Sequence, residues 1–302
     1  MHRHDQPQET LGKRILRNRA NYVMLLPFFI LFFLFTVLPV LAAIVLSFSS
    51  FDMVQLPEFV GFSNYIHLIL NDKEFLKAVK NTVIFSILMG PLSYALCIFF
   101  AWMINELPRA ARMVMTFVFY APSISGSMYV IWLYIFSSDS YGLVNSVLMN
   151  LGLISDSIYW LTDANYMLGT VIIIQLWASL GTSFLAMIAG FQGVDRSLYE
   201  AGAIDGIRNR FQELIYITLP GMGPMLLFSA VMQIGASFGV NTAALTGLPS
   251  TDYAAHTVVT HINDYGTLRY EMGYACAVAT VLFVAMLLFN RLVRKLLSRF
   301  TV

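Results

Sequence analysis

The sequence predicts an all-α membrane protein with six transmembrane helices and both termini in the cytoplasm. Three observations support this prediction. Of the 302 residues, 58% are hydrophobic and 12% are charged, whereas soluble domains carry about 25% charged residues. Six long apolar runs recur along the chain. The basic residues gather on alternate connections between these runs.

Each apolar run approaches or exceeds the length that a helix needs to cross a bilayer, which is about 20 mostly apolar residues. Asp, Glu, Lys and Arg are costly at the centre of a bilayer, and they are absent from the central part of all six runs. In chain order, the predicted spans are residues 22–48, 80–102, 113–136, 166–188, 222–240 and 272–292.

The distribution of basic residues sets the orientation. Fourteen Lys and Arg lie in the N-terminal arm, in the second and fourth connections and at the C-terminus, against four in and around the other connections. The positive-inside rule therefore places both termini in the cytoplasm. Residues 1–21 form a basic cytoplasmic arm, either an interfacial amphipathic helix or a disordered flank. Residues 22–302 form the six-helix domain.

The predicted outer connections are acidic and rich in turn-forming residues. Within the third connection, the apolar stretch 143–153 is too short to span, so we expect it along the outer surface or packed on the bundle. Cys97 and Cys276 both lie inside apolar runs, which suggests buried small side chains rather than a disulfide. His256 and His261 have no evident acidic or sulfur partner in the sequence, so no metal site is predicted.

The fourth connection, at about 191–220, is the longest of the predicted cytoplasmic connections between spans. Ser197 followed by Glu200 fits a capping box at a helix start. Gly206 permits the left-handed turn that would end this short helix. A second helical stretch, 211–217, is expected to stop before Pro220. The segment therefore predicts a stiff helix–turn–helix that the ends of two spans present to the cytoplasm.

This connection resembles the EAA loop of binding-protein-dependent permeases, the membrane subunits of type I ABC importers. The family pattern is Glu-Ala-Ala, then a glycine, then Ile-x-Leu-Pro. The corresponding residues here are Glu200-Ala201-Gly202, with Gly202 in place of the second alanine, then Gly206 and Ile217-Thr218-Leu219-Pro220. Asp205 beside Gly206 is similar to the carbohydrate-type branch, the maltose and multiple-sugar permeases. Three further stretches resemble that branch: Phe62-Ser63-Asn64-Tyr65, Leu245-Thr246-Gly247 and Met272-Gly273-Tyr274-Ala275.

The resemblance implies that this loop is a coupling helix seated in a separate ATPase subunit. The residues expected to make that contact are Glu200, Ala201, Gly202, Asp205, Gly206 and Arg208. The chain has no GxxxxGK[ST] phosphate-binding loop, so we expect ATP and Mg on the partner and no cofactor on this chain. No catalytic residue and no metal ligand is predicted, and the chain is not expected to be an enzyme.

The resemblance also implies the partners and the place of the chain. We expect a second permease, either a copy or a paralogue, two cytoplasmic ATPase subunits and an extracytoplasmic solute-binding protein, in a bacterial inner or plasma membrane. An oligosaccharide, a monosaccharide, glycerol phosphate or another polyol would each fit as the solute. The net charge of +1 gives no indication of a nucleic-acid partner.

A translocation path requires polar groups at membrane depth. The candidates are two pairs at helical i, i+4 spacing, together with two aromatic residues on which sugar rings could stack: Gln175, Ser179, Gln233, Ser237, Trp177 and Trp132. The same residue types also form hydrogen bonds between helices in any bundle, so both interpretations stay open. Gly235 and Gly239 have the spacing of a close helix crossing.

Two other classes of protein fit the sequence less well. An ion-coupled secondary transporter usually needs an ionisable residue inside the membrane, and the central parts of the six runs contain no Asp, Glu, Lys or Arg. An intramembrane enzyme would need a nucleophile with a base, or a metal-binding cluster such as HExxH, and neither motif occurs. The EAA-like loop has no role in either class.

Overall fold

The protein is described by a computed structural model that covers residues 18–125 and 128–297. Within these residues the chain is mostly helical. A two-stranded antiparallel ladder joins β1 (Ser49–Ser50) to β2 (Glu58–Phe59). The predicted basic arm lies mostly outside the described residues, which begin one residue before α2.

Among the described residues, four helical segments are long and apolar enough to cross a membrane, by length and composition. They fall on the first, second, fifth and sixth predicted spans. Their bounds are Arg19–Leu46, Lys73–Asn105, Gly223–Thr246 and Met272–Lys295. The first consists of α2 (Arg19–Phe32), the π-helical turn η1 (Phe33–Val37) and α3 (Leu38–Leu46). The others contain α5 (Lys73–Asn105), α14 (Gly223–Phe238) and α17 (Met272–Leu297).

The third and fourth predicted spans each correspond to a pair of helices bent at a short break, rather than to one straight helix. The third is α6 (Arg109–Ile124) followed by α7 (Met128–Ile135), with an angle of 92° between them. The fourth is α9 (Ala164–Ala178) followed by α10 (Thr182–Gly193), bent by 42°. Up to six spans result if each bent pair is one span.

The helix breaks have local causes in the sequence. Pro122 lies in the last turn of α6, and Ser125 after it is extended (φ −81°, ψ 112°). Gly181, before α10, leaves the helical region of φ/ψ space (φ −124°, ψ −130°). Proline and glycine both weaken a helix interior, so breaks occur at these two places.

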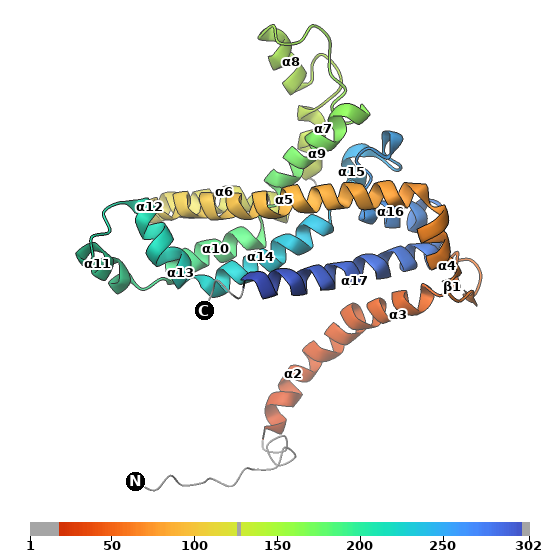
Figure 1. Ribbon diagram of the computed structural model, residues 1–302, viewed down its shortest axis with the longest axis horizontal. Helices are drawn as coiled ribbons and strands as arrows, with labels where there is room; N and C mark the ends of the chain where they lie inside the picture. Colours follow the sequence, from red (N-terminus) through yellow and green to blue (C-terminus); the bar gives the residue numbers. More distant parts are fainter. Residues whose placement is uncertain (1–17, 126–127, 298–302) are drawn as a thin grey trace.

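α5 is the central helix of the bundle and packs against both α10 and α14. α17 lies beside α14 and α3 (Figure 1). The core between α5 and α10 contains fully buried side chains from both helices, among them Cys97, Ala101, Phe184 and Met187. Cys97 is buried as expected, whereas Cys276 is only half-buried, and both are free.

α2 differs from the other long helices, because none of its residues is buried. Figure 1 shows that α3 lies close to α17, while α2 diverges from the bundle toward the N-terminus. An apolar helix that buries none of its described residues against the rest of the chain is suited to lipid or to another chain.

Short elements form the connections. Between the first two spans lie α4 (Ser63–Ile66) and η2 (His67–Asn71). The stretch predicted at 143–153 forms α8 (Leu143–Asn150), which contacts α7 and projects with it from the bundle (Figure 1). Before α17 lie α15 (Ala243–Thr246), η4 (Thr251–Tyr253), α16 (Val258–Asn263) and η5 (Asp264–Leu268).

The predicted close crossing at Gly235 and Gly239 is not formed within the described part of the chain. No atom of another helix lies within 4 Å of a Cβ built on either residue. α10 and α14 approach instead at Gly190, where a Cβ would lie 2.7 Å from Met222 Cε and 3.1 Å from Met225 Cβ. The GxxxG spacing shows that one face of α14 carries no large side chains at these two positions. It does not show whether another helix packs against that face.

Candidate functional site

The EAA-like connection begins with a short capped helix, α11 (Arg196–Ile204). Asp195 is its N-cap, and its carboxylate accepts a hydrogen bond from the backbone N–H of Ser197 (3.0 Å). The hydrogen bonds that Ser197 donates lower the pKa of Asp195. The predicted capping box at Ser197 is therefore wrong, because the helix starts one residue before it.

The turn after α11 forms as predicted. Gly206 has φ +94°, a conformation that residues with a Cβ adopt only at a cost. The backbone N–H of Ile207 donates to the carbonyl of Gly202 (2.9 Å), a bond that closes the helix end.

The second helix of the connection runs further than predicted. It comprises α12 (Arg210–Glu213), the π-helical turn η3 (Leu214–Thr218) and α13 (Leu219–Gly221). It therefore passes Pro220 instead of stopping before it. The wide turn η3 precedes this proline as η1 precedes Pro39. A turn of i→i+5 hydrogen bonds relieves the clash that a proline ring makes in a regular helix.

The two halves of the EAA-like motif contact each other. A Cβ built on Gly202 would lie 2.6 Å from Ile217 Cδ1, so Gly202 leaves room for this isoleucine. The Tyr199 and Thr218 hydroxyls lie 2.8 Å apart in a hydrogen bond. These contacts make α11, η3 and the turn between them one packed unit, which we call the coupling hairpin (residues 195–221).

The outer surface of the coupling hairpin is mostly available to a partner. Five of the six predicted coupling residues are exposed, and the sixth, Gly202, is buried against Ile217. Two apolar side chains of α11 are also uncovered: Ile204 is 87% exposed and Leu198 is 48% exposed. The hairpin therefore presents apolar and charged groups together, as protein interfaces do.

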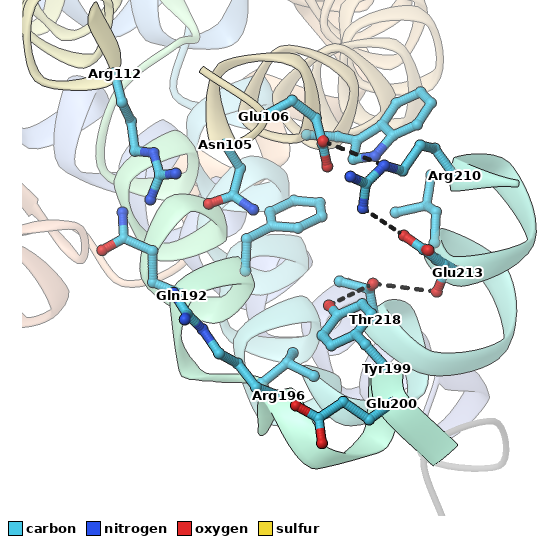
Figure 2. A pocket seen from close by; sticks show the side chains of 14 residues that line it. Asn105, Glu106, Arg112, Gln192, Arg196, Tyr199, Glu200, Arg210, Glu213 and Thr218 are labelled. Atoms are coloured by element: carbon cyan, nitrogen blue, oxygen red, sulfur yellow. Dashed lines mark hydrogen bonds and ion pairs between the residues drawn. The ribbon is translucent and has the colours of Figure 1, made fainter. Parts of the chain in front are cut away.

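A polar cavity of about 540 Å³ lies between the coupling hairpin and the ends of α5, α6 and α10 (Figure 2). Arg210 of the hairpin bonds to Glu213 (2.8 Å) and also pairs with Glu106 at the end of α5 (3.5 Å). This pair bridges the hairpin and a long helix. Exposed pairs of this kind contribute little stability, so the bridge can rearrange at low cost.

Two lining atoms of this cavity are buried without a hydrogen-bond partner in the described chain, namely Asn105 Oδ1 and Arg112 Nε. Figure 2 shows Arg112 near Gln192 on the side of the cavity opposite Arg210. Of the predicted coupling residues, only Glu200 lines this cavity. The cavity was not predicted, because its walls come from two stretches far apart in the sequence, residues 102–112 and 191–218.

A second site lies where the predicted path residues meet. Gln175, Ser179, Gln233 and Ser237 all line one cavity of about 130 Å³ between α5, α9 and α14. We call it the inner cavity. Tyr129 also lines it. The structure thus brings together the four polar residues predicted to line the path.

The polar groups of the inner cavity are also joined to one another. Gln233 Nε2 donates to the carbonyl of Ser179 (3.3 Å) and lies 3.1 Å from Cys97 Sγ. Gln175 Nε2 donates to the Tyr129 hydroxyl (3.1 Å). Gln175 and Gln233 therefore line the cavity and also form hydrogen bonds between helices, so the two interpretations of these residues are compatible.

Trp132 and Trp177 lie beside the inner cavity without lining it. Their rings meet edge to face at a centroid distance of 5.3 Å. The Trp132 indole Nε1 is buried and has no hydrogen-bond partner within the described residues.

The two helix breaks lie next to each other and close to the inner cavity. A Cβ built on Gly181 would lie 3.2 Å from Ser123 Cβ, and Ala178 and Ser179, just before that break, line the cavity. Broken helices at membrane depth present backbone groups to a cavity, and transporters use them at binding sites. Pro122 and Gly181 were the sequence signals for this arrangement.

His256 and His261 belong to a buried network at the other end of α5. His256 Nε2 lies 3.3 Å from His261 Nδ1, and His261 Nε2 lies 3.0 Å from Asp72 Oδ2. Asp72 also accepts from the Tyr274 hydroxyl (2.5 Å). The acidic partner that the sequence did not reveal is thus 189 positions away from His261.

A family of known proteins matches most of the chain. Residues 93–302 match the family described as binding-protein-dependent transport system inner membrane component. The probable ABC transporter permease protein YesP of Bacillus subtilis (strain 168) is 31% identical over 275 residues, which cover 88% of this chain and 86% of that protein.

Two further relatives carry substrate names. The arabinooligosaccharides transport system permease protein AraP of Bacillus subtilis (strain 168) is 26% identical, with 94% of this chain and 90% of that protein covered. The lactose transport system permease protein LacF of Rhizobium radiobacter is 30% identical, with 70% of each chain covered.

Solved structures share the fold. A chain of a bacterial ABC transporter involved in the import of the acidic polysaccharide alginate superposes with a TM-score of 0.79 at 26% identity, covering 97% of this chain and 100% of that one. A chain of the alginate transporter in complex with an alginate pentasaccharide-bound periplasmic protein gives the same TM-score at 27% identity, covering 97% and 99%.

Proposed function

This chain belongs to the inner membrane components of binding-protein-dependent transport systems, and from this membership we propose that it is the permease subunit of a bacterial carbohydrate ABC importer. The named relatives transport arabinooligosaccharides and lactose, which favours a sugar or oligosaccharide as the solute. The chain would form part of the translocation path and would leave ATP hydrolysis to another subunit.

The observation that carries the proposal is the coupling hairpin. Its Gly202–Ile217 contact and its hydroxyl pair bind the two helices together, while its outer face leaves the predicted contact residues uncovered. A rigid element transmits displacement, whereas a flexible loop would absorb it. We propose that an ATPase subunit binds this outer face through Glu200, Ala201, Asp205, Gly206 and Arg208.

The translocation path would pass through the inner cavity. At about 130 Å³ this cavity is smaller than the roughly 300–1,000 Å³ of ordinary small-molecule sites. We propose that it widens when the helices rock as rigid bodies and that a second permease chain supplies the opposite wall. Gln175, Ser179, Gln233 and Ser237 would then offer hydrogen bonds to sugar hydroxyls, with Trp132 and Trp177 as the aromatic surface.

The proposed assembly contains this chain, a second permease, two ATPase subunits holding ATP and Mg, and an extracytoplasmic binding protein. The periplasmic protein bound in the related alginate structure supports the last of these. The proposed arrangement in the membrane is six spans with both termini in the cytoplasm, and the coupling hairpin on that same side.

Replacing Gly206 tests the coupling role. Gly206→Pro cannot adopt φ +94°, so we expect the turn of the hairpin to be distorted. ATP-driven uptake by the reconstituted complex should fall at least tenfold, while the amount of the variant in the membrane stays unchanged. Gly61→Pro is the matched control: Gly61 also has positive φ (+61°) and has nothing within 4 Å of its Cβ position, but it lies far along the chain from the hairpin.

Normal uptake by Gly206→Pro would contradict the coupling role. Solute accumulation by this chain alone, driven by an ion gradient in vesicles, would instead support an ion-coupled secondary transporter and would refute the whole proposal.

A further inference from the structure

A second large cavity, which none of the predicted site residues line, opens at the base of the projecting arm formed by residues 137–163. Its volume is about 540 Å³, and it is lined by residues of α7, the arm and α15. Phe136, Leu161 and Leu245 give it an apolar floor, and Ser138, Asp139 and Tyr159 give it a polar and aromatic rim. We call it the arm cavity.

One buried side chain holds the rim of the arm cavity in place. Asn145 is fully buried, and its Nδ2 donates to the carbonyls of Ser137, Asp139 and Ile158 at 3.0–3.2 Å. Its Oδ1 accepts from the indole Nε1 of Trp160 (2.8 Å). These hydrogen bonds connect the two loop segments that carry Asp139 and Tyr159. The rim is therefore already formed in the absence of a ligand.

A row of aromatic rings leads from the arm cavity toward the inner cavity. Phe136, in the floor, stacks on Trp132 at a centroid distance of 5.8 Å. Trp132 meets Trp177 at 5.3 Å, and the residues next in the chain, Ala178 and Ser179, line the inner cavity. The aromatic row therefore runs from the floor of the arm cavity to Trp177, whose next neighbours in the chain line the inner cavity.

The rim has the chemistry of a sugar site. A sugar ring has an apolar C–H face and a border of hydroxyl groups, so it needs an aromatic surface beside hydrogen-bond acceptors. The Tyr159 side chain is 58% exposed. The Asp139 carboxylate accepts from the Ser137 hydroxyl through Oδ2 (3.1 Å), which orients it and leaves Oδ1 for a ligand hydroxyl.

The charges around the arm cavity select against anions. Residues 137–165 contain three acidic residues, Asp139, Asp156 and Asp163, and no Lys or Arg. A uronic acid or a phosphate would lie close to the Asp139 carboxylate with no basic residue of the arm to neutralise it.

We propose that the arm cavity binds one ring of a neutral saccharide before the saccharide reaches the inner cavity. The proposal rests on the carbohydrate-importer function given above. It narrows the substrate class from any sugar or polyol to uncharged saccharides, and it assigns the stacking surface to Tyr159 and the accepting carboxylate to Asp139.

Equilibrium binding to the purified complex, without its binding protein, tests the proposal. The probes are arabinotriose and lactose as neutral saccharides, and an alginate trisaccharide and glycerol 3-phosphate as anions. We expect the neutral probes to bind at least tenfold more tightly than the anions. Tyr159→Ala should weaken neutral binding about tenfold, as loss of an aromatic stacking contact does, whereas Tyr159→Phe keeps the ring and should bind almost as the unmodified chain does.

Tyr141→Ala is the matched control, because Tyr141 is 88% exposed on the same arm and does not line the cavity. Equal saccharide binding by Tyr159→Ala and Tyr141→Ala would overturn the proposal. Anion binding as tight as neutral binding would overturn it too. ATP-driven uptake of the same probes by the unmodified complex is measured in parallel, so a failure of the importer function is seen separately.

Discussion

At the scale of the single residue, Asp72 shows how far a sequence position can differ from its expected role. In the sequence, Asp72 is one of the acidic residues of the first predicted outer connection, but in the structure it is only 3% exposed. Its carboxylate caps α5 through the backbone N–H of Phe75 (2.7 Å) and also accepts from His261 and Tyr274. Burial alone would raise the pKa of Asp72, but these three hydrogen bonds outweigh it and hold the pKa well below its ordinary value.

The neighbouring His256 predicts a dependence of stability on pH. Burial, and then the nearby His261, lower the pKa of His256 from 6.5 to about 4. Between pH 6.5 and about pH 4, His256 is protonated in the unfolded chain but neutral in the folded chain. The free energy of unfolding therefore decreases as the pH falls through this range. The pKa of Asp72 is lowered too, but its contribution is lost only below the ordinary carboxylate range.

We expect the folded state to lose about 2 kcal/mol between pH 7 and pH 5 through His256. The Tm of the detergent-solubilised protein, measured at both pH values, should fall more for the unmodified chain than for His256→Gln. His67→Gln is the control, since His67 is exposed. An identical fall in Tm for all three chains would show that His256 does not titrate in this range.

At the scale of the element, composition and charge predicted the spans well and their shapes poorly. Apolar length fixes where a helix can cross the membrane, and the spans at 80–102 and 272–292 lie inside α5 and α17. Apolar length does not predict where a span bends, because a proline or glycine inside a span breaks some helices and not others. Pro91 lies within the unbroken α5, whereas Pro122 lies one turn from a break.

The coupling hairpin shows the same limit. The positive φ of Gly206 was predictable, because few other residues suit a left-handed turn. The first residue of α11 was not predictable from the sequence, because Asp195 and Ser197 are both good capping residues. Only the structure shows that Asp195 is the N-cap. The residues around the inner cavity were found because polar side chains are rare in apolar runs. The cavity beside the hairpin was not found, because residues 102–112 and 191–218, which line it, are far apart in the sequence.

The adjacent helix breaks predict a steric effect at Gly181. Gly181→Val would place its Cβ 3.2 Å from Ser123 Cβ, and overpacking of this kind costs about 1–3 kcal/mol. We expect a Tm lower by several degrees and reduced ATP-driven uptake. Gly169→Val on α9 is the control, since nothing lies within 4 Å of its Cβ position. Equal effects of the two substitutions would mean that the contact between the breaks is unimportant.

At the scale of the whole molecule, the proposed orientation separates the coupling hairpin from the arm by the thickness of the membrane. Single cysteines at Asp205 and Asp156, in a chain whose Cys97 and Cys276 are replaced by Ala, test this with a membrane-impermeant maleimide. In right-side-out vesicles we expect Asp156→Cys to be labelled at once. Asp205→Cys should be labelled only after permeabilisation and removal of peripheral subunits. The reverse pattern would invert the topology and rule out a cytoplasmic coupling hairpin.

The contacts of the long helices also set an order in which the chain can be built during synthesis. α2 buries none of its residues, so it can enter the bilayer as soon as it leaves the ribosome. α5 cannot form all of its native hydrogen bonds so early. The side-chain amide of Asn81 donates to the carbonyls of Tyr253 and His256 at 2.9 Å, so it stays unsatisfied until more than 170 further residues have been translated. Nascent α5 therefore depends on water, lipid headgroups or the insertion machinery for that interval.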